Sequence, residues 1–233
     1  MPDKTPLILL PGLLLDAGLW AHQTETLGDI ADMTVADLTI DDSVGAMAKR
    51  VLDGAPPRFA LAGLSMGGYV AQEIMRRAPD RVIKLALLDT SHKADTPEQT
   101  ERRLGLIELS KKGKFKGVTQ RLLPMLVNEA HLDNEAITGP IMAMAEHVGQ
   151  EGFARQQAAI MGRPDGTEDL ERIQCSTLVL VGRDDALTPP DIMADMASRI
   201  PNATFVTIEN AGHLPPLEQP EAVSAVLRYW LGA

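Results

Sequence analysis

Short apolar runs alternate along most of the chain with segments in which apolar residues recur every three or four positions. The runs show little polar alternation, which is typical of parallel strands buried on both faces of a sheet. The expected strands span residues 5–10, 34–38, 59–63, 82–89, 177–182 and 203–208. The expected helices between them span residues 19–30, 43–52, 66–78, 191–200 and 221–231. This order predicts an α/β fold with a doubly wound, mostly parallel sheet, whose ligand site lies beyond the carboxyl ends of the strands.

The alternation stops between residues 91 and 172, where only helical patterns occur. They span residues 98–110, 117–127, 137–147 and 153–161, and are separated by glycine and proline. A run of helices between two strands of one sheet predicts an insertion above the ligand crevice. We therefore expect a core made of residues 1–90 and 173–233 and a helical cap made of residues 91–172.

Charge and composition exclude several functional classes. The chain has 233 residues and a formal net charge of −10, which disfavours a nucleic acid or an anionic membrane as a partner. Aromatic residues make up only 3% of the chain, so a base-stacking site is not expected. No apolar run is long enough to span a membrane, and the single cysteine, Cys175, fits a reducing compartment. These features predict a cytoplasmic protein that acts on a small molecule.

The segment Gly63-Leu64-Ser65-Met66-Gly67 matches the pattern G-x-S-x-G between an expected strand and an expected helix. A serine on such a turn adopts a strained backbone that exposes its hydroxyl, and glycine two positions away on either side avoids a clash. The helix that follows offers unpaired N–H groups beside that hydroxyl. Ser65 is therefore the candidate nucleophile.

A serine hydroxyl needs a general base, and His213 is the best placed of the five histidines because it follows the last expected strand. The base in turn needs a carboxylate that holds its tautomer. Three aspartates stand at strand ends: Asp89, Asp184 and Asp185. With Asp184 or Asp185 as the acid, the order is serine, acid, histidine, and Asp89 is the alternative from an earlier strand.

At these residues the chain resembles the α/β-hydrolase superfamily, particularly small capped members such as carboxylesterases, enol-lactone hydrolases, carbon-carbon bond hydrolases and non-haem haloperoxidases. In that family the acid ends a G-x-x-D turn, which corresponds here to Gly182 to Asp185. The resemblance therefore implies that Asp185, and not Asp184, is the acid of a catalytic triad with Ser65 and His213.

The resemblance also implies an oxyanion hole. The family's first donor follows a His-Gly pair, and Pro11-Gly12 takes that place here. A backbone donor does not depend on the replaced side chain, so the N–H groups of Leu13 and Met66 are the expected pair. The family's early hairpin has no counterpart before residue 5, which implies a sheet truncated at its N-terminal edge. Such an edge is compatible with a monomer or a homodimer.

The cap corresponds to the family's helical lid, which sets specificity. The candidate pocket residues are Met125, Met142, Met144 and Met161, although methionines at helical spacing also pack as ordinary core. Basic residues gather in the cap as well: Arg102, Arg103, Lys111, Lys112, Lys114, Lys116 and Arg121. They form either a solvated surface or a site that attracts a carboxylate substrate or an acidic acyl carrier protein.

These observations predict a serine hydrolase that cleaves a small, largely apolar ester, lactone or thioester through an acyl-enzyme on Ser65. No metal-ligand spacing or phosphate-binding loop occurs, so neither a metal nor a cofactor is expected. Carbon-carbon bond hydrolysis and cofactor-free haloperoxidase or perhydrolase chemistry can use the same residues. The alternative of another class is a non-catalytic ligand receptor or regulatory protein that keeps the fold.

Overall fold

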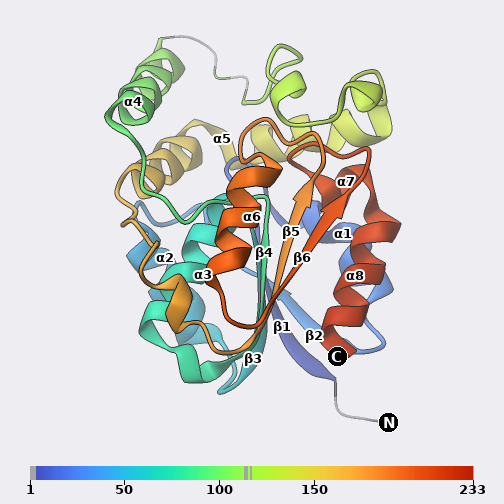
Figure 1. The fold of residues 1–233 in the computed structure, drawn as a ribbon. Coiled ribbons are helices and arrows are strands. Elements are labelled where there is room, and N and C mark those ends of the chain that lie inside the picture. Colours follow the sequence, from blue (N-terminus) through green and yellow to red (C-terminus); the bar gives the residue numbers. More distant parts are fainter. Residues whose placement is uncertain (1–3, 113–114, 116, 233) are drawn as a thin grey trace.

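A six-stranded sheet in which all strands run parallel forms the centre of the molecule, in the order β2-β1-β3-β4-β5-β6 (Figure 1). The computed structural model describes residues 4–112, 115 and 117–232. The strands are β1 (Thr5–Leu10), β2 (Ala31–Val35), β3 (Phe59–Leu64), β4 (Val82–Leu88), β5 (Ser176–Gly182) and β6 (Ala203–Ile208). The predicted α/β class and parallel sheet are confirmed.

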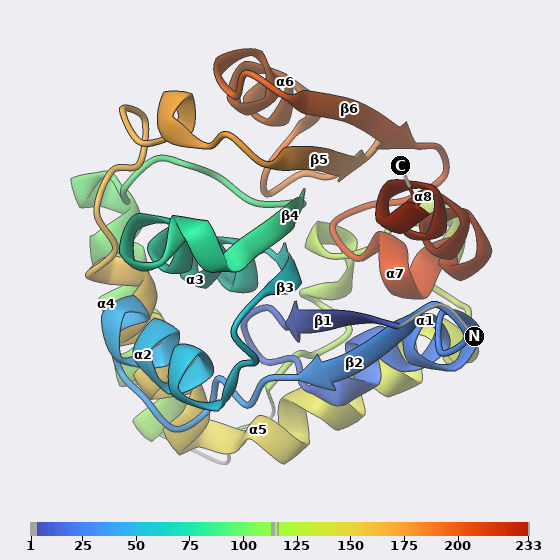
Figure 2. The same cartoon turned by 90° about the horizontal axis from the view of Figure 1, so that it is seen from below.

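Helices cover both faces of this sheet (Figure 2). One face carries α2 (Val44–Gly54), α3 (Met66–Arg77) and α6 (Pro190–Arg199); the other carries η1 (Ala17–Trp20), α1 (Ala21–Thr26), α7 (Pro215–Glu218) and α8 (Pro220–Gly232). The short helix η2 (Pro79–Arg81) precedes β4. Alternate residues of a strand point to opposite faces, so Leu7 and Leu9 enter one apolar cluster while Ile8 and Leu10 enter the other. Two buried faces explain why the strands lack polar alternation.

Four described helices of residues 91–172, the cap segment, lie over the carboxyl ends of the strands (Figure 1). They are α4 (Pro97–Lys111), η3 (Leu123–Met125), η4 (Glu129–His131) and α5 (Glu135–Met161). The fifth, η5 (Leu170–Arg172), lies beside the C-terminal end of α3. The division of the chain into core and cap stays a prediction. In the part of the chain that the structure describes, no helix has the length and hydropathy to cross a lipid bilayer.

Several element boundaries differ from the expected ones; the expected helix 19–30, for example, is η1 followed by α1 and ends at Thr26. Strand β2 begins at residue 31 rather than 34. The Ala31 N–H donates a hydrogen bond to Leu27 O in the turn after α1, and Ala31 is already paired with Thr5 of β1. Residues 117–127 form turns and η3 rather than a helix, since Gly117 has a φ of +58° and Pro124 follows. The two expected helices 137–147 and 153–161 both lie in α5, which is interrupted between them at Gly149, a residue with non-helical backbone angles (φ 68°, ψ −179°).

A buried carboxylate near the start of the cap segment forms ion pairs with arginines from two separate parts of that segment. Asp95, whose side chain is 1% exposed, pairs with Arg103 of α4 at 2.6 Å and with Arg163 beyond α5 at 2.8 Å. The guanidinium of Arg163 also lies 4.2 Å from the ring centre of Tyr69 on α3. The cap segment is thereby fixed to a helix that covers the sheet.

We expect Asp95→Ala to lower the free energy of unfolding by about 3 kcal/mol, because it leaves the buried guanidinium of Arg163 and the half-buried one of Arg103 without this carboxylate. Urea denaturation measures this change. The matched control is Asp53→Ala, which removes one partner of an exposed ion pair with Lys49 and should change the free energy of unfolding little. Equal effects of the two substitutions would contradict the assignment.

Candidate active site

Ser65 lies at the turn from β3 into α3, with a φ of 54° and a ψ of −116°. This backbone conformation is rare for a residue with a side chain. Flanking glycines make room for it: a Cβ at Gly63 would lie 2.4 Å from the carbonyl oxygen of Gly67, and a Cβ at Gly67 would lie 2.2 Å from that of Leu10. The need for glycine on both sides of Ser65 thus comes from close backbone contacts.

The turn after β1 packs against this elbow. A Cβ at Gly12 would lie 3.3 Å from the Cβ of Ser65, which places the next residue, Leu13, beside the serine. Within the described residues, the backbone N–H groups of Leu13 and Met66 donate no hydrogen bond. Two free N–H groups next to a serine, one of them at the start of a helix, can stabilise an anion.

Gln156 of α5 supports this turn, although no sequence pattern pointed to it. Its side chain is fully buried; Oε1 accepts a hydrogen bond from the Leu14 N–H at 2.9 Å, and Nε2 donates to Leu38 O at 3.3 Å. Leu14 has a φ of 60°, a conformation that favours glycine. A side chain of the cap segment therefore holds the turn that carries Leu13.

His213 connects the serine to an acid. Its Nε2 lies 2.9 Å from Ser65 Oγ, and its Nδ1 lies 2.8 Å from Asp185 Oδ2. A carboxylate only accepts hydrogen bonds, so Nδ1 carries the hydrogen and Nε2 accepts the serine hydroxyl. His213 is 4% exposed and Asp185 is 3% exposed. The structure thus brings together three side chains from the ends of three different strands.

Asp185 remains ionised in spite of its burial. Desolvation raises the pKa of a buried carboxyl, but the facing His213 ring and hydrogen bonds from Thr188 Oγ1 and the Leu187 N–H hold the pKa of Asp185 well below its usual range. Asp184, the other candidate of this turn, is exposed and accepts a hydrogen bond from Asn128 Nδ2 at 2.6 Å. The geometry therefore places Asp185, and not Asp184, on the histidine.

Glu218 is hydrogen-bonded to the backbone of both residues that flank His213. Its side chain is fully buried, and Oε1 accepts hydrogen bonds from the Gly212 N–H at 2.9 Å and the Leu214 N–H at 3.2 Å. Oε2 faces the cap segment, where it accepts from the Asn128 N–H at 2.6 Å and lies 3.0 Å from His131 Nδ1. A carboxylate with several donors around it fixes the residues on both sides of His213.

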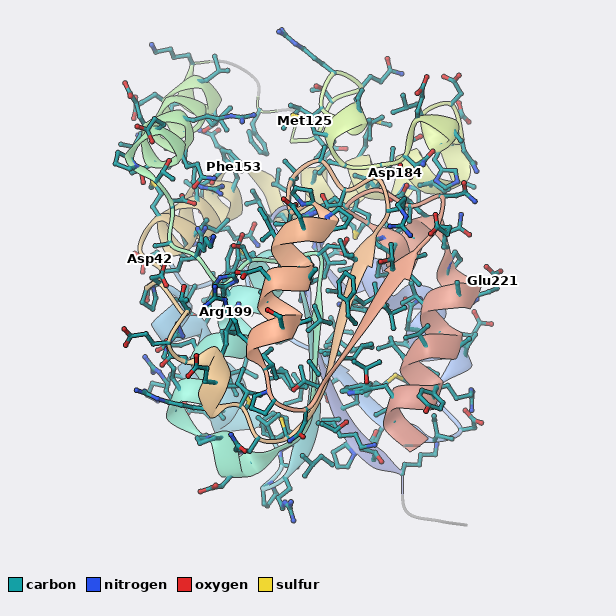
Figure 3. All side chains as sticks on the ribbon, viewed as in Figure 1. Asp42, Met125, Phe153, Asp184, Arg199 and Glu221 are labelled. Atoms are coloured by element: carbon teal, nitrogen blue, oxygen red, sulfur yellow. The ribbon has the colours of Figure 1, made fainter. Side chains whose placement is uncertain are left out.

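Residues 126–131, which we call the cap strap, complete this connection. The His213 N–H donates to Leu126 O at 3.0 Å. A Cβ at Gly212 would lie 2.8 Å from the carbonyl carbon of Val127, so glycine before the histidine is what lets the strap approach. Figure 3 shows Met125, next to the strap, above Asp184 at the carboxyl end of the sheet. The strap thus contacts both the turn of residues 182–185, called the acid turn, and the loop of residues 212–214, called the histidine loop.

The four candidate pocket methionines are not gathered at one place. Met144 is buried near Gly18, Met125 lies 3.9 Å from an Arg102 nitrogen, and Met142 and Met161 are partly exposed on α5. Their role as substrate-lining residues stays a prediction. Among the described residues, two cavities of about 290 and 240 Å³ lie elsewhere, against α3 and beside β2.

Three groups that could ligate a metal, Asp89, Asp185 and His213, lie within 4.8 Å of one another. A cation held there by all three would compete with the hydrogen bonds that His213 makes to Asp185 and Ser65. The arrangement fits proton transfer between serine and histidine better than metal ligation.

We expect Glu218→Gln to lower the free energy of unfolding by about 2 kcal/mol. The glutamine amide keeps one acceptor oxygen, and its NH₂ group would face backbone N–H groups that now donate to the second carboxylate oxygen. Amide hydrogen exchange at Gly212 and Asn128 should become faster, since both donate to this side chain. The control is Glu209→Gln, at an exposed partner of Arg183. Unchanged exchange at Gly212 and Asn128 would exclude this role for Glu218.

Comparison with known proteins agrees with this geometry. Residues 7–226 match the model of the family described as "Alpha/beta hydrolase family". A pimeloyl-[acyl-carrier protein] methyl ester esterase of Legionella pneumophila is 27% identical over 225 residues, which cover 93% of this chain and 90% of the relative.

Two solved structures share the fold over nearly the whole chain. A thermophilic esterase from Thermogutta terrifontis is 34% identical with a TM-score of 0.89, and the match covers 98% of this chain and 90% of the esterase. The enol-lactonase of Burkholderia xenovorans is 21% identical with a TM-score of 0.88 over 99% of this chain and 92% of the lactonase, and supports the fold alone. On its family match, its sheet and these relatives, the chain belongs to the alpha/beta hydrolase family.

Proposed function

We propose that this protein is a serine hydrolase that cleaves a small, largely apolar carboxylic ester, lactone or thioester. The observation that carries the proposal is the continuous hydrogen-bonded chain from Ser65 through His213 to Asp185. Esterases among its relatives support the same reaction class. The catalytic residues of the proposal are Ser65, His213 and Asp185, with the backbone N–H groups of Leu13 and Met66 as the oxyanion hole.

The reaction follows from the protonation states of these groups. His213 Nε2 accepts the proton of the Ser65 hydroxyl as Oγ attacks the ester carbonyl carbon, and Asp185 stabilises the imidazolium that forms. The carbonyl oxygen becomes an anion that the N–H groups of Leu13 and Met66 stabilise. The imidazolium then protonates the leaving alcohol, and the acyl group remains on Ser65. His213 Nε2 next takes a proton from a water molecule whose oxygen attacks the acyl carbon, and then gives that proton to Ser65 Oγ as the bond between Oγ and the acyl carbon breaks and the acid leaves.

The cap segment supports an apolar substrate. Leu13 and Leu126 pack at the edge of the apolar cluster that includes Val127, Ile141 and Met144. Leu13 lies in the turn after β1, beside Ser65, and Leu126 lies in the cap strap, so the acyl group of an ester on Ser65 would meet aliphatic rather than charged side chains.

We expect Ser65→Ala to lower kcat/KM for p-nitrophenyl esters by at least about 10³-fold, because it removes the nucleophile and keeps the oxyanion donors. A series from acetate to decanoate, measured at steady state, gives the acyl length that fits best. Mass spectrometry should find the acyl group on Ser65 in the wild-type protein. Ser198→Ala, at an exposed serine on α6, is the matched control.

Two results would contradict the proposal. Turnover that survives Ser65→Ala would show that another group carries the reaction. A single burst without further turnover in the wild-type protein would favour the alternative of a non-catalytic receptor.

A substrate carried on an acyl carrier protein is the second candidate. Relatives described as pimeloyl-[acyl-carrier protein] methyl ester esterases motivate it, and so do exposed basic residues on the cap segment. Arg103 is engaged by Asp95 and Lys111 by Glu108. Within the described residues, no ion pair occupies Arg102, Lys112 and Arg121. Lys114 and Lys116 of the predicted basic cluster lie outside the described residues.

We expect the combined substitutions Arg102→Gln, Lys112→Gln and Arg121→Gln to raise KM for an ester linked to an acyl carrier protein by about tenfold at low salt, because an acidic carrier loses its attraction to the cap. The free methyl ester of the same acyl group should react as with the wild-type protein. The control removes the same charge elsewhere, through Lys49→Gln, Arg50→Gln and Arg77→Gln. If both triple variants raise KM equally, only the total charge matters and the docking idea is wrong.

A further inference from the structure

A second aspartate lies directly behind the acid of the proposed triad. Asp89 follows β4 with a φ of 42°, its N–H donates to Leu180 O at 2.9 Å, and its side chain is fully buried. Its Oδ1 accepts a hydrogen bond from the Gly182 N–H at 2.8 Å. Gly182 ends the strand that leads to Asp185, so Asp89 belongs to the framework of the acid turn.

The other oxygen of Asp89 has no partner that can donate to it. Within the described part of the chain, Asp89 Oδ2 receives no hydrogen bond although it is buried. A carboxyl oxygen of Asp89 lies within 4.8 Å of a carboxylate oxygen of Asp185 and of a ring nitrogen of His213. An acceptor without a donor is costly in such a place, whereas a hydroxyl there would have the Asp185 carboxylate as its acceptor.

The surrounding charges decide which of the two acids holds a proton. Asp185 has the His213 ring, the Thr188 hydroxyl and a backbone N–H around it, all of which favour its ionised form. Burial, the Asp185 carboxylate and Glu218 raise the pKa of Asp89 well above its usual range. Two carboxylates this close cannot both carry a charge at low cost, and Asp185 has the better partners.

We propose that Asp89 is a neutral carboxylic acid that donates a hydrogen bond to the Asp185 carboxylate and so positions the acid that orients His213. This inference rests on the proposed function, since it assigns Asp89 as a positioning residue of the same triad. A neutral donor fixes the Asp185 carboxylate and spreads part of its charge without adding a second charge beside His213. The pair then presents a single negative charge to the imidazole.

Two substitutions separate a neutral Asp89 from an ionised one. Asparagine reproduces the hydrogen bonds of the protonated acid, because its oxygen can accept from the Gly182 N–H while its amide donates to Asp185. Glycine removes both hydrogen bonds and tolerates the positive φ at this position, where alanine or leucine would add backbone strain. Asp89→Asn is therefore the conservative variant and Asp89→Gly the disruptive one.

The measured quantity is the pKa of His213, from the NMR titration of its ring in histidine-labelled protein and from the acid limb of kcat/KM. If Asp89 is neutral, Asp89→Asn leaves this pKa close to the wild-type value. Asp89→Gly raises it, because a carboxylate that loses a donor holds the imidazolium more strongly, and lowers kcat/KM about tenfold or more. If Asp89 is ionised, both variants remove a negative charge and lower the pKa of His213, which would overturn the proposal. An unchanged pKa in Asp89→Gly would overturn it as well.

Infrared spectroscopy tests the protonation directly and without activity. In protein labelled with ¹³C-aspartate, the wild type should show the carbonyl band of a protonated carboxylic acid at neutral pH, and Asp89→Asn should lack it. A wild type without this band excludes a neutral Asp89 even if Asp89→Gly does not fold. If Ser65→Ala keeps ester hydrolysis while the band depends on Asp89, the proposed function fails and the assignment of Asp89 stands.

Discussion

The strained turn at Ser65 is the constraint on which the rest of the site depends. Its left-handed backbone is possible only because Gly63 and Gly67 let the turn, the start of α3 and the end of β1 approach within van der Waals distance. The turn of Gly12 and Leu13 after β1 lies beside the serine as well. Because β1, β3, β4, β5 and β6 follow one another in one parallel sheet, the groups at their carboxyl ends meet at a single edge. The position of the site thus follows from the order of the strands.

The cap segment contributes to this arrangement as well as covering it. Gln156 supports the turn that carries Leu13, and the cap strap is hydrogen-bonded to the His213 loop, to Glu218 and to Asp184. Most of these contacts involve buried groups, so their loss would leave polar atoms without partners. The cap segment therefore influences the geometry of the site through two separate connections, one to the turn that carries Leu13 and one to the loop that carries His213.

Sequence patterns sufficed for the fold class because the strands are apolar on both faces and alternate with helices, a pattern that few architectures share. Sequence patterns predicted the helix ends less well where local signals conflict. Gly139 and Pro140 resemble a helix break, yet α5 continues past them, while residues 117–127 have helical spacing but contain a left-handed glycine. Periodicity alone does not show whether a glycine or a proline ends a helix or lies within one.

The sequence by itself determined the elbow, the candidate histidine and the family resemblance, because glycine spacing and the order of motifs are properties of the chain. Residue order left Asp184 and Asp185 open, and the family resemblance favoured Asp185. The tertiary structure shows that these adjacent side chains have different partners, with Asp185 on His213 and Asp184 on Asn128. It also revealed Gln156 as a neighbour of the site, placed Asp89 behind Asp185, and joined Glu218 to Asn128 of the cap strap. Their contacts join residues far apart in the chain, and such contacts leave no local pattern because packing alone creates them.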